Sequence, residues 1–81
     1  QMAAEKADPQ NDIINHPAHY TQGGIECIDA IRAAVTNCNG FEGYCVGNII
    51  KYVWRFKDKN GVQDLEKAGW YLKTLTEEVK K

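Results

Sequence analysis

Amide, ammonium, phenol and guanidinium side chains recur on one side of a helix-like segment in the second half of the chain. One set falls at offsets of zero, three, four and seven: Asn48, Lys51, Tyr52 and Arg55. This spacing places side chains on one face of an α-helix. Arginine offers a planar fork of donors and lysine a movable charge, and both suit phosphate oxygens. The pattern predicts a local site for a small anion.

A second set follows at offsets of zero, three, six and seven: Asp64, Lys67, Trp70 and Tyr71. If the two segments form a helical hairpin, Arg55 comes close to Asp64 and Lys67 near the turn. The turn itself contains Lys59, Asn60 and Gly61. The backbone N–H groups after Asn60 and Gly61 open the later helix, where the dipole favours an anion. The nearby aromatic rings suit stacking on a nucleobase.

Ordinary explanations exist for the same residues and stay open at the level of sequence. Charged residues on an amphipathic helix usually form a solvated face, here with Asp58, Asp64 or Glu66 as counter-charges. Aromatic side chains at these positions are more often core and rim than a base platform. Asp64 also suits the first turn of a helix, where a carboxylate compensates the dipole.

The segment "NHPAHYTQGG" precedes these sets and carries His16 and His19. Two histidines three apart, with no cysteine close by, are a weak zinc signal, so we expect them to order the loop by hydrogen bonds. Glu26 and Asp29 follow at a spacing that puts both carboxylates on one helix face. One such pair is a poor cage for Mg²⁺ unless substrate phosphates add ligands. A plain early-helix carboxylate is the alternative for Glu26.

Composition restricts the kind of partner. The chain has 81 residues and a formal net charge of -1, which argues against general DNA or RNA binding. Its three cysteines form no C-x-x-C pair, so we expect free thiols in a reducing cytoplasm. No apolar run is long enough to span a bilayer, and no Walker-type G-x-x-x-x-G-K-[ST] occurs.

Periodicity predicts an all-α fold of three helices without a sheet. We expect a flexible N-terminal arm over residues 1–14 and one helical nucleotide-binding domain over residues 15–81. The helices are expected from Gly24 or Ile25 to the "TNCNG" stop, from Phe41 to Lys57, and from Val62 to Lys80. Gly43 and Gly47, four apart in the second helix, predict close approach of another backbone or a ligand. So small a core favours a homo-oligomer.

Four motifs occur in order: "HPAHY", "GGIECIDAI", "GNIIKYVWRFKDKNG" and "DLEKAGWYL". Together they resemble a family of small phage proteins that are nucleotide-kinase-like or of unknown function and lack a P-loop. The resemblance covers about Asn15 to Leu75. It implies phosphorylation of deoxynucleoside monophosphates. It also implies a nucleotide site at His16, His19, Tyr20, Glu26, Asp29, Asn48, Lys51, Tyr52, Arg55, Lys59, Asn60, Gly61, Asp64 and Lys67.

Phosphoryl transfer requires cations on the transferring group and in-line oxygens. Under this resemblance Lys51 and Arg55 are the expected catalytic cations, with Lys67 adding charge. Glu26 and Asp29 are the expected catalytic carboxylates, which orient the acceptor or hold a metal ion such as Mg²⁺. The "NHPAHYTQGG" segment is expected to be a lid hinged at its glycines. The pocket is expected between subunits, because one small monomer can hardly enclose a nucleotide.

Three functions fit these expectations in the cytoplasm of an infected bacterial host cell. The first is a nucleoside monophosphate kinase. The second is a non-catalytic sponge that sequesters a host immune signalling nucleotide. The third is a module that docks on a host protein through its aromatic and cationic surface. Transfer of phosphate, binding without product, and protein binding without nucleotide affinity distinguish them.

Overall fold

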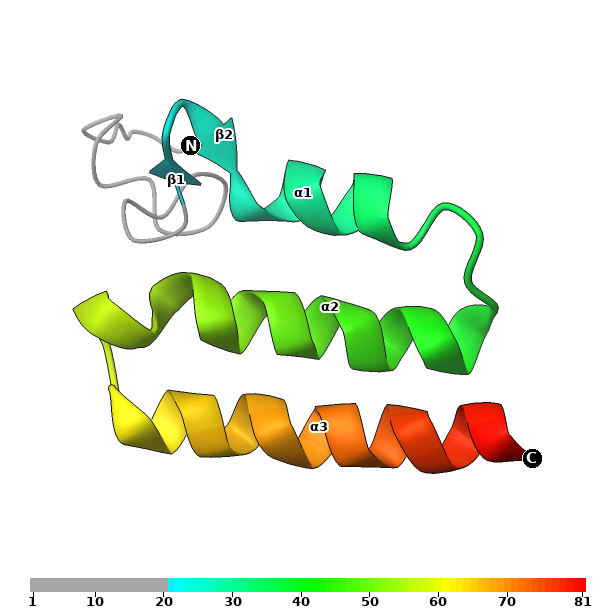
Figure 1. Cartoon of the computed structure of the whole chain (residues 1–81). Helices are drawn as coiled ribbons and strands as arrows, with labels where there is room; N and C mark the ends of the chain where they lie inside the picture. The colour runs from blue at the N-terminus through cyan, green and yellow to red at the C-terminus, as the bar shows by residue number, and fades with distance from the viewer. Residues whose placement is uncertain (1–20) are drawn as a thin grey trace, which may run out of the picture.

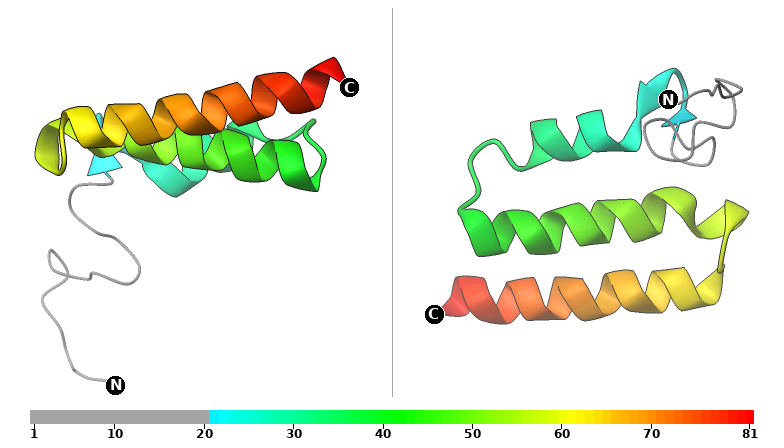
Figure 2. Two further views of the ribbon diagram at one scale, coloured as in Figure 1. Left: turned by 90° about the horizontal axis from the view of Figure 1, so that it is seen from below. Right: turned by 180° about the vertical axis from the view of Figure 1, so that it is seen from behind.

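Three α-helices in one layer form most of the protein. The computed structural model describes residues 21–81, so the expected N-terminal arm lies outside the described residues. The helices are α1 (Cys27–Ala34), α2 (Gly40–Arg55) and α3 (Val62–Lys80). They run alternately up and down, and α2 lies between α1 and α3 (Figures 1 and 2). The expected all-α, three-helix class is confirmed.

A short hairpin precedes α1, although the sequence analysis expected no strand. Strand β1 (Thr21–Gln22) pairs antiparallel with β2 (Ile25–Glu26), with Gln22 opposite Ile25. Gly23 and Gly24 form the two-residue turn with φ of 59° and 79°. Positive φ at both central residues gives a turn whose twist matches that of paired strands. The glycines therefore close a hydrogen-bonded hairpin where a hinge was expected, and α1 begins only at Cys27.

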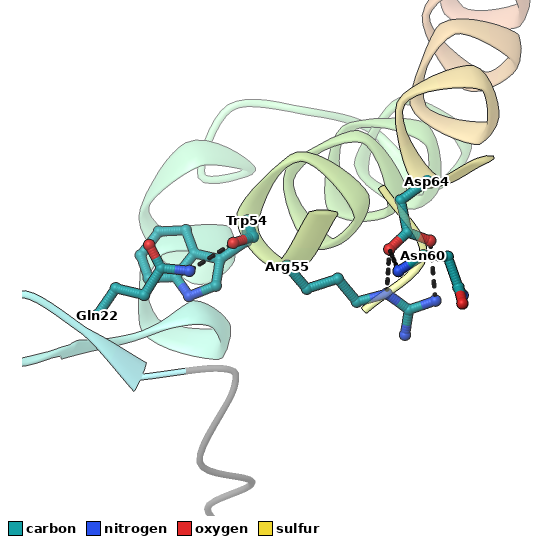
Figure 3. A network of polar contacts seen from close by, with 5 residues as sticks. All are labelled: Gln22, Trp54, Arg55, Asn60 and Asp64. Carbon is teal, nitrogen blue, oxygen red and sulfur yellow. Dashed lines mark hydrogen bonds and ion pairs between the residues drawn. The ribbon is translucent and has the colours of Figure 1, made fainter. Parts of the chain in front are cut away.

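The hairpin is attached to the far end of α2. The side-chain amide of Gln22 donates a hydrogen bond to the backbone carbonyl of Trp54 (Figure 3). This contact joins residues 32 positions apart in the chain. It places the start of the described chain beside the C-terminal half of α2, which carries Lys51 and Arg55.

Helix α1 packs on α2 across the glycine pair. A β-carbon placed on Gly43 would lie 3.7 Å from the Cβ of Val35, and one on Gly47 would lie 3.4 Å from the Cγ2 of Ile31. At both glycines the neighbouring atoms belong to side chains and lie at ordinary van der Waals distance, so an alanine would fit. The expected close approach of another backbone or a ligand therefore stays a prediction.

A capping box starts α2. The backbone N–H of Glu42 donates to Oδ1 of Asn39 at 2.9 Å, and the backbone N–H of Asn39 donates to Oε1 of Glu42 at 3.0 Å. Both bonds satisfy N–H groups that a helix N-terminus leaves without partners. Asn39, expected as a stop signal for the preceding helix, therefore starts the next one.

The turn between α2 and α3 is tight. Helix α2 continues into one turn of 3₁₀-helix, η3 (Phe56–Asp58), in place of the α-helix expected to Lys57. Gly61 then adopts a φ of 54° and its N–H donates to the carbonyl of Phe56 at 2.8 Å. Helix α3 follows with the bounds that the sequence predicted.

The core is thin. Among the described residues, the fully buried apolar side chains are Cys27, Cys45 and Ala68. A single layer of helices has no second layer against which to bury its faces. No helix in the described part of the chain combines the length and hydrophobicity needed to cross a bilayer.

Candidate functional site

Three positive charges gather around the ring of Tyr52. The Nζ of Lys51 lies 4.5 Å from the ring centroid, the guanidinium carbon of Arg55 lies 5.0 Å from it, and the Nζ of Lys67 lies 5.4 Å from it. All three distances fall within the range of cation–π attraction. Lys51, Tyr52 and Arg55 come from α2 and Lys67 comes from α3. These residues, called the Tyr52 cluster below, converge as their helical spacing predicted.

Arg55 is engaged by a carboxylate from the neighbouring helix. Its Nε donates to Oδ2 of Asp64 at 3.2 Å, and its Nη2 donates to Oδ1 at 3.2 Å (Figure 3). The side chain of Asp64 is fully buried and that of Arg55 is 12% exposed. This bidentate pair joins the end of α2 to the start of α3. Arg55 thus holds the helical hairpin together beside the ring of Tyr52.

Asp64 also occupies the start of α3. Its Oδ2 accepts a hydrogen bond from the backbone N–H of Asn60 at 3.2 Å. Burial alone would raise the pKa of Asp64, but the hydrogen bonds from Arg55 and Asn60 and the charge of Arg55 hold it below its usual value. The sequence analysis expected the N–H groups after Asn60 and Gly61 to receive a bound anion. The carboxylate of Asp64 takes the N–H of Asn60 itself, which precedes those groups, so the expected anion site stays a prediction.

Lys51 and Lys67 are the two lysines of the Tyr52 cluster. Within the described residues, neither has a carboxylate partner. Lys51 also lies close to the N-terminus of α1: burial raises the pKa of the Cys27 thiol, and the charge of Lys51 acts in the opposite direction. The raised pKa keeps Cys27 a protonated, unreactive thiol at neutral pH. Two ammonium groups without carboxylate partners among the described residues thus lie near one ring and make the electrostatic potential there positive.

An aromatic row extends from this cluster along the α2–α3 contact. The ring of Tyr71 stacks on Tyr52 at 6.0 Å between centroids and meets Tyr44 edge-on at 5.7 Å. Trp70 lies edge-on to Tyr71 at 4.9 Å and is 63% exposed. The sequence analysis missed Tyr44, although it lies one turn before Asn48 on the same helix face. The row provides exposed π surface next to the cations.

The row is fixed by a hydrogen bond between two phenols. The hydroxyl oxygens of Tyr44 and Tyr71 are 3.3 Å apart. This bond, with burial and the neighbouring phenols and Cys45 as further causes, raises the pKa of Tyr71 to about 12. Tyr71 is therefore neutral at physiological pH, and α2 and α3 are joined at a second point besides the Arg55–Asp64 pair.

The remaining predicted site residues that the structure describes are not part of the Tyr52 cluster. The amide nitrogen of Asn48 donates to the carbonyl of Tyr44, one turn earlier in its own helix, at 2.9 Å. Glu26 is the N-cap residue of α1 and is half-buried, whereas Asp29 is exposed in its first turn. Lys59 is exposed in the turn before α3. His16, His19 and Tyr20, with the proposed lid, lie outside the described residues.

The described part of the chain offers few ligands for a metal ion. No three His, Cys, Asp or Glu side chains there are arranged to hold a metal ion. Glu26 and Asp29 provide two carboxylates one turn apart, and phosphate oxygens of a substrate would have to complete a Mg²⁺ shell.

Comparison with known proteins assigns the chain to a family. A family model described as DUF3310, a protein of unknown function, matches residues 14–73. The chain belongs to this family. The match contains α1, α2 and the part of α3 that carries Asp64, Lys67, Trp70 and Tyr71, so all the contacts described above fall within it. No solved structure matches the chain.

Two phage proteins are similar to the chain. The gene 1.7 protein of Enterobacteria phage T3 is 37% identical over 75 residues, which cover 86% of this chain and 45% of the relative. The nucleotide kinase gp1.7 of Escherichia phage T7 is 38% identical over 63 residues, which cover 72% of this chain and 32% of the relative. The resemblance to a phage nucleotide-kinase-like family is confirmed. The chain spans less than half the length of these relatives.

Proposed function

We propose that the Tyr52 cluster binds the phosphate groups of a nucleotide. The observation that carries the proposal is the position of Lys51 and Lys67, on two different helices, within 4.5 and 5.4 Å of one ring centroid and without a carboxylate partner among the described residues. Two like charges held together repel each other, and a bound phosphate relieves that repulsion. The ammonium groups would supply charge-assisted hydrogen bonds to the phosphate oxygens.

Arg55 serves this site as a positioning residue in the proposal. Its bidentate bond to Asp64 sets the separation of α2 and α3, and with it the separation of Lys51 and Lys67. The exposed aromatic surface of Trp70 and Tyr44 lies farther along the same helices and is suited to stack on a base. The nucleotide would then lie along α2 and α3, with its phosphates at Tyr52 and its base toward Trp70.

The activity we propose for the site is phosphoryl transfer between nucleotides, supported by the name of the phage T7 relative. An oxygen of a deoxynucleoside monophosphate would attack the γ-phosphorus of a nucleoside triphosphate. The new P–O bond forms as the bond to the β-phosphate oxygen breaks, which yields two diphosphates. Lys51 and Lys67 would neutralise charge on the transferring group, and electrostatic positioning of this kind is the main demand of the reaction. Glu26 and Asp29 stay as the predicted carboxylates.

Binding without transfer is a second candidate, and the state of Asp64 favours it. Asp64 is the carboxylate bonded to the Tyr52 cluster, and it is fully buried, paired with Arg55 and held at a lowered pKa, so it is poorly suited to accept a proton from a substrate. Transfer would therefore have to depend on Glu26 and Asp29 of the α1 end, whereas binding would not. A protein that sequesters a signalling nucleotide needs the cationic cluster and the aromatic row but no base.

Calorimetric titration with nucleoside mono- and triphosphates tests the binding site. Lys51→Ala and Lys67→Ala should each weaken binding by about tenfold or more, because a hydrogen bond to a charged group contributes about 1.5–3 kcal/mol. Lys80→Ala is the matched control: it removes a lysine from the exposed end of α3, where Lys80 pairs only with Glu77. Unchanged affinity in both cluster variants, or an equal loss in the control, would contradict the site.

Incubation with labelled triphosphate and a deoxynucleoside monophosphate separates the two candidates. Labelled diphosphate product that disappears in Lys51→Ala supports the kinase. Tight binding with no product, in the chain and in a version extended to the length of its relatives, supports sequestration.

A further inference from the structure

Helix α3 carries a second apolar stripe that the three-helix layer leaves uncovered. Leu65, Leu72 and Val79 lie seven residues apart and are 41%, 54% and 65% exposed. Val62, on the same side one turn before Leu65, is 70% exposed. Residues at heptad spacing form one continuous stripe along a helix, as in coiled coils.

This stripe is distinct from the face that packs on α2. The contacts with α2 are made by Asp64 and Tyr71, and Ala68 between them is buried. Leu65 and Leu72 each follow one of these inward positions, Asp64 and Tyr71, by one place, so the stripe lies on a flank of α3. Helix α1 lies on the other side of α2 and does not reach it (Figure 1). A solvent-exposed stripe of four large apolar side chains calls for a partner.

The charges beside the stripe indicate which partner. Glu66, Lys73 and Lys80 also repeat every seven residues, each next to a stripe residue. In a parallel pair of α3 helices the two rows of charges would lie on opposite sides of the apolar contact and would not meet. In an antiparallel pair the acidic start of one row faces the basic end of the other, so Glu66 meets Lys73 of the second copy. We propose that the chain forms a twofold dimer through antiparallel pairing of the α3 stripes.

Gly69 fits the centre of this arrangement. It lies in the middle of the stripe, and a β-carbon placed there would meet nothing within 4 Å in the chain itself. Glycine inside a helix costs about 1 kcal/mol relative to alanine, so its presence is unexplained by the monomer. In the antiparallel register that opposes Glu66 and Lys73, Leu72 of one copy packs over Gly69 of the other.

The length of the stripe sets the strength of the dimer. Residues 62–79 extend about 26 Å along the helix at 1.5 Å per residue. One helix pair of this length buries less than the roughly 1,600 Å² of a standard interface. We therefore expect reversible association with a Kd on the order of 10 µM.

Sedimentation equilibrium of the chain between about 1 and 200 µM measures this association. Leu72→Glu should weaken it at least tenfold, since it places a charge at the centre of the apolar contact. Ile28→Glu is the matched control: Ile28 is equally exposed, at 55%, but lies on α1. Circular dichroism of each variant checks that the helices are retained.

Charge reversal tests the direction of pairing. Glu66→Lys and Lys73→Glu should each weaken the dimer, because each creates like charges across the interface. The double reversal should restore it. In a parallel pair these charges do not meet, so single reversals would have no effect and the double reversal would restore nothing.

Several results would overturn the proposal. They are a monomer at every concentration, a dimer indifferent to Leu72→Glu, a dimer lost equally in Ile28→Glu, or single charge reversals without effect. If another segment of a longer chain covers the stripe instead, that longer chain would be a monomer, and Leu72→Glu would lower its stability. Nucleotide binding is measured separately and does not enter these outcomes.

Discussion

At the scale of single residues, Asp64 determines what its neighbours can do. It takes both donors of one edge of Arg55 and the N–H of Asn60. One buried carboxylate therefore ties the turn to α3 and orients the arginine beside Tyr52. Because Arg55, which the sequence suggested as a phosphate clamp, is bonded to Asp64, the proposed phosphate site depends on Lys51 and Lys67.

The lowered pKa of Asp64 makes the stability of the fold dependent on acid. Its unfolded value is about 3.9 and its folded value is lower, so the ionised form stabilises the fold above about pH 4. This stabilisation is lost as the pH falls through the folded pKa. We expect urea midpoints to be level between pH 7 and pH 5 and to fall steeply below pH 4.

Asp64→Asn isolates this effect from the other carboxylates. The variant should melt several degrees lower at pH 7, because it removes the buried carboxylate charge that the guanidinium of Arg55 contacts. The difference from the unaltered chain should shrink as the pH approaches 3, where Asp64 becomes neutral too. A difference that stays constant from pH 7 to pH 3 would show that the ion pair does not carry the stability.

Helical spacing was enough to predict the cations and to name Asp64 as one of three possible counter-charges, with Asp58 and Glu66, but not to choose among the three. Lys51, Tyr52 and Arg55 share a face because of their offsets alone, and Lys67 joins them once α2 and α3 form a hairpin. The pairing of Arg55 with Asp64 depends on the 3₁₀ turn and on the positive φ of Gly61, which offsets do not reveal. The tyrosine row was missed for a related reason, since it requires the register of two helices.

At the scale of elements, Asn39 shows how one residue can carry two signals. An asparagine after a helix often ends it, but Asn39 is followed three places later by Glu42, which is the spacing of a capping box. The two hydrogen bonds of that box are present, so the residue starts α2. The same holds for Gly23 and Gly24, whose placement between two short extended runs is a hairpin signal.

Removing this cap should weaken the fold without affecting the site. Asn39→Ala is expected to lower the free energy of unfolding by about 1 kcal/mol, because it deletes the side-chain acceptor of the Glu42 N–H. Asn39 precedes the start of α2, three turns away from Lys51, so nucleotide affinity should stay unchanged. Urea denaturation gives the first quantity and calorimetry the second. A loss of affinity comparable to that of Lys51→Ala would contradict this separation.

At the scale of the whole molecule, a single layer of helices buries little apolar surface. Its stability therefore depends on ligands or further copies that bind its faces. The buried apolar side chains in the described residues are few and small, and two of them are cysteines. The length and composition predicted such a thin core and an oligomer to compensate for it. They did not indicate which surface would be shared, because the α3 stripe is recognised only once Asp64, Ala68 and Tyr71 are seen to face α2.

This architecture predicts that the melting temperature depends on protein concentration and on nucleotide independently. Association that involves only the folded state stabilises it by mass action, so raising the concentration above the Kd should raise the melting temperature. Leu72→Glu should abolish the concentration dependence and keep the rise with nucleotide. Lys67→Ala should do the reverse, since Lys67 lies at Tyr52 and outside the apolar stripe. If both variants lost both effects, the nucleotide site and the dimer interface would be one surface, and their assignment to opposite flanks of α3 would be wrong.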